Sequence, residues 1–295
     1  MLWNERLITE RRGDGGLTSA ALLAPSPELT PCVRAYVTRC TVGAALSAQE
    51  RMNHFPAVPT CAITWFVHGD YAHKGADGEP MMGELPHPVM LTGPHTRPRV
   101  SVNSGAVDVF ILLLLPDALH ALTGLDIAAL VDRYYRPADV MNADWSAMVQ
   151  AVQQAADHSA RIEIVEGFLL PRWQALAVNT EQRNAAFQQW TRSVTKRAER
   201  HAAGRSERQI DRRIKDWTGL SLRQLLGIGR GESTVLHARD AWAANALSWA
   251  EIAARLGFSD QAHLSREFRR ITGLSPRQLK YLLTHESGWM YQIWA

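Results

Sequence analysis

The pattern of apolar and polar positions is clearest near the C-terminal end of the chain, between Asp260 and Leu279. On a helical wheel, Leu264, Phe268 and Ile271 fall on one side. The opposite side carries Ala262, Ser265, Arg266 and Arg269. The pattern predicts an amphipathic helix whose apolar side packs and whose polar side is free to contact another molecule.

This pattern occurs twice, at an offset of 54 residues. The stretch from Ser206 to Ser221 matches the stretch from Asp260 to Ser275 at its apolar and at its basic positions. Each copy opens on a residue that favours the helix N-cap. Each closes on Thr-Gly-Leu-Ser, where the glycine can adopt the left-handed conformation that ends a helix. Two copies in register are far more specific than one.

A short helix is expected before the second copy, from Ser248 to about Leu256, followed by a turn at Gly257-Phe258-Ser259. Helix, glycine-containing turn and helix with an exposed polar face is the order of a helix-turn-helix unit, whose second helix enters the major groove of DNA. A long helix from Ser233 to Ala246 should join the two copies, with the glycines of residues 227–231 as a loose start before it.

These residues resemble the DNA-binding domain of AraC/XylS-type transcription regulators, in which a long helix joins two helix-turn-helix units. The resemblance is closest from Ala253 to Pro276, and in the first unit it rests on residues 206–210 and 218–221. By position it implies base contacts from Arg208, Asp211, Arg212, Gln261, Ala262, Ser265 and Arg266. Phosphate contacts, which set register but carry little sequence information, are expected from Lys215, Arg269, Arg270 and Arg277.

The first unit departs from the family pattern in three places. Arg197 stands where its supporting helix should offer an aliphatic residue, and Arg205 occupies a turn position that is usually apolar. Asp211 would repel phosphate, although it could accept a hydrogen bond from cytosine. The first unit is therefore expected either to read DNA less strongly or chiefly to position the domain.

The N-terminal part predicts an α+β organisation, with a small barrel or sandwich followed by helices. Residues 1–28 should be largely loose, and residues 32–42 fit a helix end or a strand equally well. Strands are expected at residues 61–67, 89–91, 99–102 and 108–115, around a turn-rich segment at 68–80. The run Val109–Leu115 lacks alternation, so both of its faces should be buried. Helices should follow at 116–122, 126–132, 144–156 and 162–177, the last interrupted at Pro171.

We expect two domains, at residues 1–178 and 179–295, with a polar helical connector at 179–191. Residues 59–65 and 93–96 resemble, more loosely, the N-terminal domain of one branch of the same family, which implies a regulatory or dimerisation domain. Charge divides in the same way, because residues 1–179 sum to −5 and residues 180–295 to +8. A basic domain beside an acidic one is typical of nucleic-acid binding through one half of the chain.

The three cysteines, Cys32, Cys40 and Cys61, form no close pair, which favours a reducing compartment and excludes a four-thiolate zinc site. The charged first residues do not form a signal peptide, and the longest apolar run is too short to span a bilayer. A cytoplasmic protein is expected, with no contact to a membrane. The apolar tail at residues 288–294 should pack back on the protein.

Two further interpretations concern the N-terminal half. Histidines at positions 54, 68, 73, 87 and 95 could hold a catalytic metal, but none forms a short ligand pair, so no metal, cofactor or catalytic residue is expected. Trp65, Phe66, Tyr71 and Phe110 could line a ligand pocket, although at strand spacing they are more typical of plain core. Arg97 and Arg99 could hold an anionic effector or lie solvated at an edge.

The residues together favour a non-enzymatic, sequence-specific regulator whose partner is double-stranded DNA. Effector binding or dimerisation through the N-terminal domain would control it, and RNA polymerase would be a further partner of an activator. The alternative is an enzymatic N-terminal domain that the DNA-binding part only anchors. A third hypothesis is an architectural DNA-binding protein, which would bind all duplexes with equal affinity.

Overall fold

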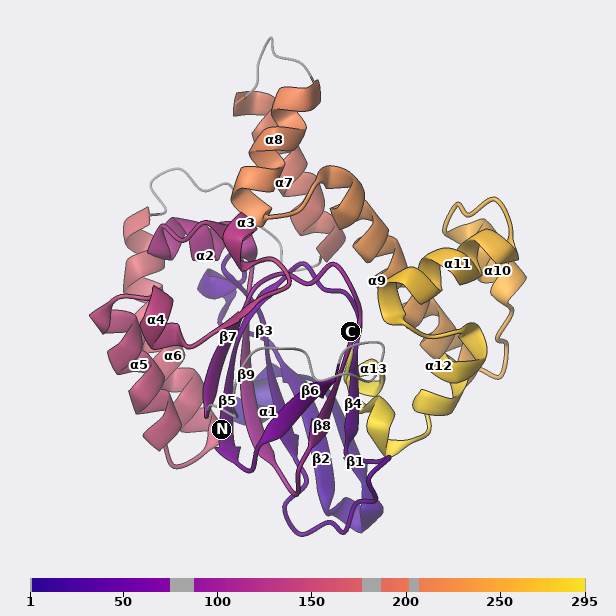
Figure 1. Cartoon of the computed structure of the whole chain (residues 1–295), viewed down its shortest axis with the longest axis horizontal. Coiled ribbons are helices and arrows are strands. Elements are labelled where there is room, and N and C mark those ends of the chain that lie inside the picture. Colours follow the sequence, from indigo (N-terminus) through magenta and orange to yellow (C-terminus); the bar gives the residue numbers. More distant parts are fainter. Residues whose placement is uncertain (1, 75–87, 177–186, 202–206, 295) are drawn as a thin grey trace.

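The computed structural model describes residues 2–74, 88–176, 187–201 and 207–294, and Figure 1 shows strands in the N-terminal half and helices in the C-terminal half. The described strands form two antiparallel sheets. The larger sheet has the order β1 (Leu7–Gly13), β2 (Thr18–Leu23), β3 (Val33–Cys40), β9 (Asp108–Leu114), β5 (Cys61–His68), β7 (Val89–Thr92) and β10 (Tyr134–Tyr135). The smaller sheet has the order β4 (Met52–Phe55), β8 (Arg99–Asn103) and β6 (Tyr71–Lys74).

Strand β9 lies between β3 and β5 and is buried on both faces, as its unbroken apolar run predicts. Phe110, Leu112 and Leu114 point into the main core, whereas the intervening Val109, Ile111 and Leu113 belong to a second cluster on the other face. The main core continues into the helices that follow the strands, where the indole of Trp65 donates a hydrogen bond to the Val149 carbonyl, 3.0 Å away.

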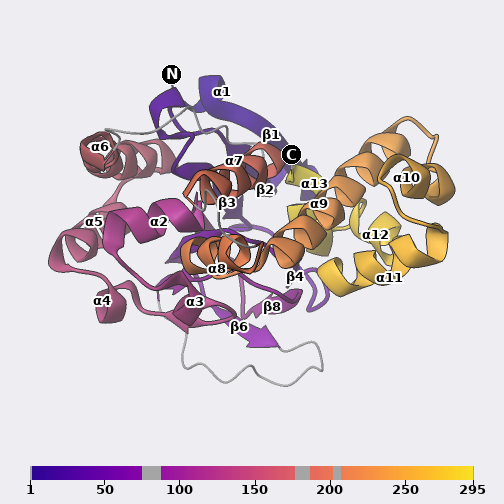
Figure 2. The ribbon, with the colours of Figure 1, turned by 90° about the horizontal axis from the view of Figure 1, so that it is seen from above.

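Helices cover one face of the larger sheet, and the C-terminal helices occupy the other side of the molecule (Figures 1 and 2). The N-terminal helical segments are α1 (Leu2–Arg6), η1 (Asp14–Gly16), η2 (Pro27–Leu29), α2 (Pro116–Thr123), α3 (Ile127–Leu130), α4 (Pro137–Val140), α5 (Ala143–Gln154) and α6 (His158–Leu176). The C-terminal ones are α7 (Phe187–His201), α8 (Glu207–Thr218), α9 (Leu222–Ala243), α10 (Trp249–Arg255), α11 (Gln261–Thr272), α12 (Pro276–Leu282), η4 (Glu286–Gly288) and α13 (Trp289–Ile293). This layout confirms the predicted fold class.

The structure corrects three sequence predictions and decides, at residues 33–40, one that was open. Residues 7–13 and 18–23 are not loose, because they pair with each other and add two strands to the larger sheet. Residues 33–40 form a strand. Helix α6 runs through Pro171 without a break. The joining helix begins at Leu222, and Gly227, Gly229 and Gly231 lie inside it.

One of those helical glycines, Gly231, is explained by close packing, which a search for turn residues overlooks. A Cβ atom on Gly231 would lie 2.5 Å from a methyl carbon of Ile271, so helix α11 crosses α9 where no side chain fits. Parts of the predicted turn-rich segment at 68–80 and of the connector at 179–191, together with Arg205 and the N-cap at Ser206, lie outside the described residues.

Candidate nucleic-acid interface

The second helix-turn-helix unit consists of α10, a turn at Gly257 and α11. The Asp260 carboxylate accepts a hydrogen bond from the His263 backbone amide at 2.6 Å and so caps the start of α11. The helix ends at Gly273, whose φ of 72° lies in the left-handed region. Both ends of α11 are therefore fixed by the residues that the sequence pattern singled out.

The two faces of α11 divide as predicted. Leu264, Phe268 and Ile271 are buried. Most of the residues predicted to read bases or contact phosphate are exposed, namely Gln261, Ala262, Arg266, Arg269 and Arg270, and Ser265 is half-buried. Arg270 pairs with Glu267 at 2.9 Å along the helix, an exposed contact that DNA could replace.

The first unit consists of α7 and α8. Ile214 is buried, and Arg208, Arg212 and Lys215 are exposed on α8. Asp211 is half-buried, and its carboxylate accepts a hydrogen bond from the Leu222 amide at 2.9 Å at the start of α9. Asp211 therefore has a structural contact in addition to its predicted place on the reading face.

Arg197, which breaks the family pattern, has a specific environment. Its guanidinium lies 4.4 Å from the centre of the Trp217 ring and donates a hydrogen bond to the Asp117 carboxylate at 2.6 Å. The same carboxylate accepts a hydrogen bond from the Trp190 indole at 2.9 Å. Asp117 belongs to α2 of the N-terminal part, so this cluster docks the first unit on that part. Sequence reasoning missed it, because no local spacing connects residues 117 and 197.

The two predicted reading helices are not parallel in this structure. Helix α8 stands upright in Figure 1 while α11 lies across the view, and α11 is again seen from the side when the molecule is turned in Figure 2. Helix α8 contacts α2 and α3, whereas at the end of α11 the Ile271 carbonyl accepts a hydrogen bond from the Ala57 amide at 2.7 Å. The two units thus rest on different parts of the N-terminal half.

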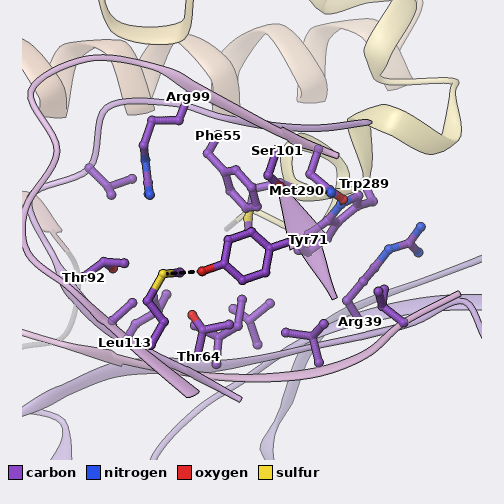
Figure 3. A pocket seen from close by; sticks show the side chains of 18 of the residues that line it. Arg39, Phe55, Thr64, Tyr71, Thr92, Arg99, Ser101, Leu113, Trp289 and Met290 are labelled. Atoms are coloured by element: carbon purple, nitrogen blue, oxygen red, sulfur yellow. Dashed lines mark hydrogen bonds between the residues drawn. The ribbon is translucent and has the colours of Figure 1, made fainter. Parts of the chain in front are cut away.

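A cavity lies between the two sheets, with about 910 Å³ of space including solvent at its mouth (Figure 3). Its walls come from Val37, Thr64, Phe66, Ile111 and Leu113 of the larger sheet, from Asn53, Phe55, Tyr71, Arg99 and Ser101 of the smaller one, and from Trp289, Met290 and Trp294. No Asp, Glu, His or Cys occurs among its described lining residues. Trp65 and Phe110 belong to the core, whereas Phe66 and Tyr71 face the cavity. Two of the four aromatic residues are thus plain core and two line a pocket.

Arg99 is a charged group of the cavity wall that has hydrogen-bonding capacity to spare. Its guanidinium points inward in Figure 3, donates a hydrogen bond to the Tyr134 hydroxyl at 3.0 Å and lies 5.7 Å from the centre of the Phe55 ring. Its Nε is shielded and has no hydrogen-bond partner. Arg97 does not line the cavity.

The described residues contain no group of three or more His, Cys, Asp and Glu side chains placed to hold a metal ion. Among the same residues no helix is long and apolar enough to cross a bilayer.

Comparison with known proteins adds two family matches. Residues 201–281 match the family described as "Helix-turn-helix domain", and residues 22–136 match the "Domain of unknown function (DUF6597)". No curated protein gives a significant match. The first match covers most of the duplicated region, including α8, α9, α10 and α11.

Similar solved structures include forms of ToxT from Vibrio cholerae. ToxT from strain O395 is 11% identical, with a TM-score of 0.37 over 79% of this chain and 94% of that one. Another crystal form is 13% identical, with a TM-score of 0.39 and coverage of 79% and 94%. An unsaturated fatty acid bound form from strain SCE256 is 11% identical, with a TM-score of 0.34 and coverage of 80% and 94%. These similarities are too distant to carry an argument about function.

The exposed face of α11 and the helix-turn-helix match define a DNA-binding transcription regulator. Its helix-turn-helix domain at residues 201–281 is of the AraC type, in agreement with the sequence motifs.

Proposed function

We propose that the protein reads a specific, asymmetric DNA site through two successive major-groove segments. Helix α11 reads one segment with Gln261, Ala262, Ser265 and Arg266, and helix α8 reads the other with Arg208 and Arg212. The observation that supports this most strongly is that two units of the same pattern both expose the polar side of their second helix. Arginine can bind guanine bidentately, and glutamine can read adenine. Lys215, Arg269 and Arg270 contact phosphate and hold the register.

The first prediction concerns base reading. Selection of a random duplex pool by the full chain is expected to yield a motif with two parts about one helical turn, ~34 Å, apart. Arg266→Ala should relax one part and Arg212→Ala the other, each by about 1–3 kcal/mol. Arg269→Ala is the matched control on the same helix, and it should weaken all duplexes alike. If both test variants behave like the control, the arginines do not read bases.

We further propose that the cavity between the sheets holds a small, mainly apolar effector with one acidic group. Its walls are mostly apolar, and Arg99 offers a cation whose Nε has no hydrogen-bond partner. Largely apolar pockets with a few fixed polar groups are typical of ligand sites. The described lining offers no carboxylate, imidazole or thiol beside its hydroxyl groups, which favours binding over catalysis and sets this proposal apart from the enzymatic alternative.

The second prediction tests the acid preference with a matched pair of probes. Octanoate and octanamide have nearly the same shape but differ in charge, so calorimetric titration should show octanoate binding at least about tenfold more tightly. Arg99→Gln should abolish that difference while leaving octanamide binding unchanged. Equal binding of both probes by the wild-type chain would contradict a role for Arg99 as the anion partner.

A further inference from the structure

The C-terminal segment, which we define as residues 286–294, lies against the N-terminal half. Its two short helices, η4 and α13, contact strands β1, β2 and β4. Trp289, Met290 and Ile293 are buried in the second apolar cluster, on the face of the larger sheet that the N-terminal helices leave uncovered. The segment therefore occupies a binding surface of the N-terminal half, although it belongs to the DNA-binding half of the chain.

Glu286 anchors this segment through a buried network of charges. Its carboxylate pairs with Arg11 and with Arg39 and accepts a hydrogen bond from the Thr18 hydroxyl at 3.1 Å. Arg39 is 2% exposed, so it has no access to water that could replace this partner. A buried charge that loses its only counterion is strongly destabilised, which makes Glu286 a specific contact.

Trp289 adds a second specific contact. Its indole donates a hydrogen bond to the Asn53 amide oxygen at 2.8 Å, and the Asn53 amide nitrogen in turn donates to Ser101 at 3.2 Å. The Arg39 guanidinium lies 5.3 Å from the centre of the Trp289 ring. The segment is thus recognised by paired charges, by hydrogen bonds and by apolar contacts.

The segment is rigidly connected to the second helix-turn-helix unit. The Tyr291 hydroxyl donates a hydrogen bond to the Thr272 carbonyl at the end of α11, at 3.3 Å. The Gln292 amide donates to the Leu282 carbonyl at 2.8 Å. A Cβ atom on Gly288 would lie 1.9 Å from the same carbonyl oxygen, so the segment packs closely on α12. Moving α11 toward DNA while these contacts persist would pull the segment off the sheet.

The first unit is held by a different surface. Asp117 of α2 binds both Trp190 and Arg197 of α7. A Cβ atom on Gly219, at the end of α8, would lie 2.9 Å from the Ile127 carbonyl oxygen, so α8 closely approaches α3. Both units also pack on α9, so α8 and α11 are held crosswise by this joining helix together with their separate docking surfaces (Figures 1 and 2).

Two equivalent units that read successive turns of straight DNA are related by a shift along its axis, which leaves their reading helices parallel. The observed arrangement does not meet this condition. We infer that the C-terminal segment is an autoinhibitory latch, which holds α11 away from the DNA-reading arrangement until it leaves the N-terminal sheet. This inference rests on the proposed two-segment reading and adds how that reading is controlled.

The cavity gives the latch a means of control. Trp289 and Met290 form part of its wall, so a ligand in the cavity contacts the latch directly. Any ligand that binds the latched and released forms with different affinity shifts the equilibrium between them, and DNA binding shifts ligand affinity by the same factor.

A reversible disulfide lock tests the latch. A Cβ atom on Gly273, after α11, would lie 3.3 Å from the Cβ of Pro98, next to the N-terminal strand β8, which is close to the separation in a disulfide. In the double variant Pro98→Cys with Gly273→Cys, oxidation should hold the second unit in place. We expect the oxidised form to bind the duplex selected by the wild-type chain at least tenfold more weakly, and reduction to restore binding. The two single variants, treated identically, are the controls.

The opposite change should release the latch. Glu286→Gln keeps the size of the side chain but removes the countercharge of Arg11 and Arg39, so affinity for the selected duplex should rise at least tenfold. A melting measurement on the same sample confirms that the variant is folded. If the oxidised double variant binds the selected duplex as tightly as the reduced form, the latch proposal is wrong, whatever affinity Glu286→Gln shows. If the wild-type chain and the reduced double variant select no motif, the proposed function itself has failed, so the two failures are distinguishable.

Discussion

Asp117→Ala is expected to lower the free energy of unfolding by about 3–5 kcal/mol, because it leaves a part-buried arginine without its partner. The Asp117 side chain is 3% exposed, and its two carboxylate oxygens receive the Trp190 indole and the Arg197 guanidinium. Alanine removes both acceptors at once, and water has little access to replace them. Urea unfolding of the full chain measures the effect.

The matched control is Asp144→Ala, which removes an aspartate from a pair with Arg172 at a similar distance, 2.9 Å. This pair lies at the surface, with 68% of the Asp144 side chain exposed, so its loss should cost less than about 1 kcal/mol. Equal effects of the two substitutions would show that Asp117 does not dock the first unit. The contrast isolates burial, because both variants remove an aspartate that faces an arginine.

The sequence predicts the second unit almost completely, because every feature of α11 is local. The N-cap at Asp260, the apolar positions and the terminal Gly273 all lie within one short stretch, and the structure uses each of them as expected. The buried strand β9 could be predicted for the same reason, since a run without polar residues has no face to expose to water.

Features that depend on distant contacts escaped prediction. Strand β1 carries charged residues, and both β1 and β2 look loose in sequence, but β1 pairs with β2 and β2 pairs with β3, which gives their backbone groups partners. The glycines of α9 suggested a break, and the one at Gly231 is required by the close approach of α11. The role of Glu286 was invisible because its two arginine partners lie more than two hundred residues earlier in the chain.

The sequence therefore predicts the DNA-contacting residues of each helix separately, but it does not predict how the two helices are oriented relative to each other. Periodicity shows which side of α8 or α11 is free, but their crosswise arrangement depends on long-range contacts of α8 with α2 and α3, and of α11 with α9, Ala57 and the C-terminal segment. The apolar tail was expected to pack back on the protein, and it does so. Its partner, the uncovered face of the larger sheet, could be identified only from the fold.

Acidification from pH 6.5 to pH 4 is expected to destabilise the protein through His95 by about 3 kcal/mol. The ring is 1% exposed, and burial together with the Arg99 charge lowers the pKa of His95 to about 4, against the opposing effect of Asp132. In the unfolded chain the pKa of a histidine is about 6.5. The folded state therefore favours the neutral ring, so this contribution to stability is complete above pH 6.5 and is lost as the pH falls toward 4.

The variant His95→Phe keeps a ring against Tyr134, 5.2 Å away between ring centres, but cannot take up a proton. Its free energy of unfolding is measured with urea at a series of pH values. Between pH 6.5 and pH 4 it should fall less steeply than that of the wild-type chain. Asp132→Asn is the contrasting control, because its hydrogen bonds from Thr96 and His95 lower the pKa of that carboxylate to about 2 despite burial. Its stabilisation is lost only between about pH 4 and pH 2. If stability depends on pH between 6.5 and 4 as strongly in His95→Phe as in the wild-type chain, the titrating group is not His95. Arg99 would then not lower the pKa of His95 as its position implies.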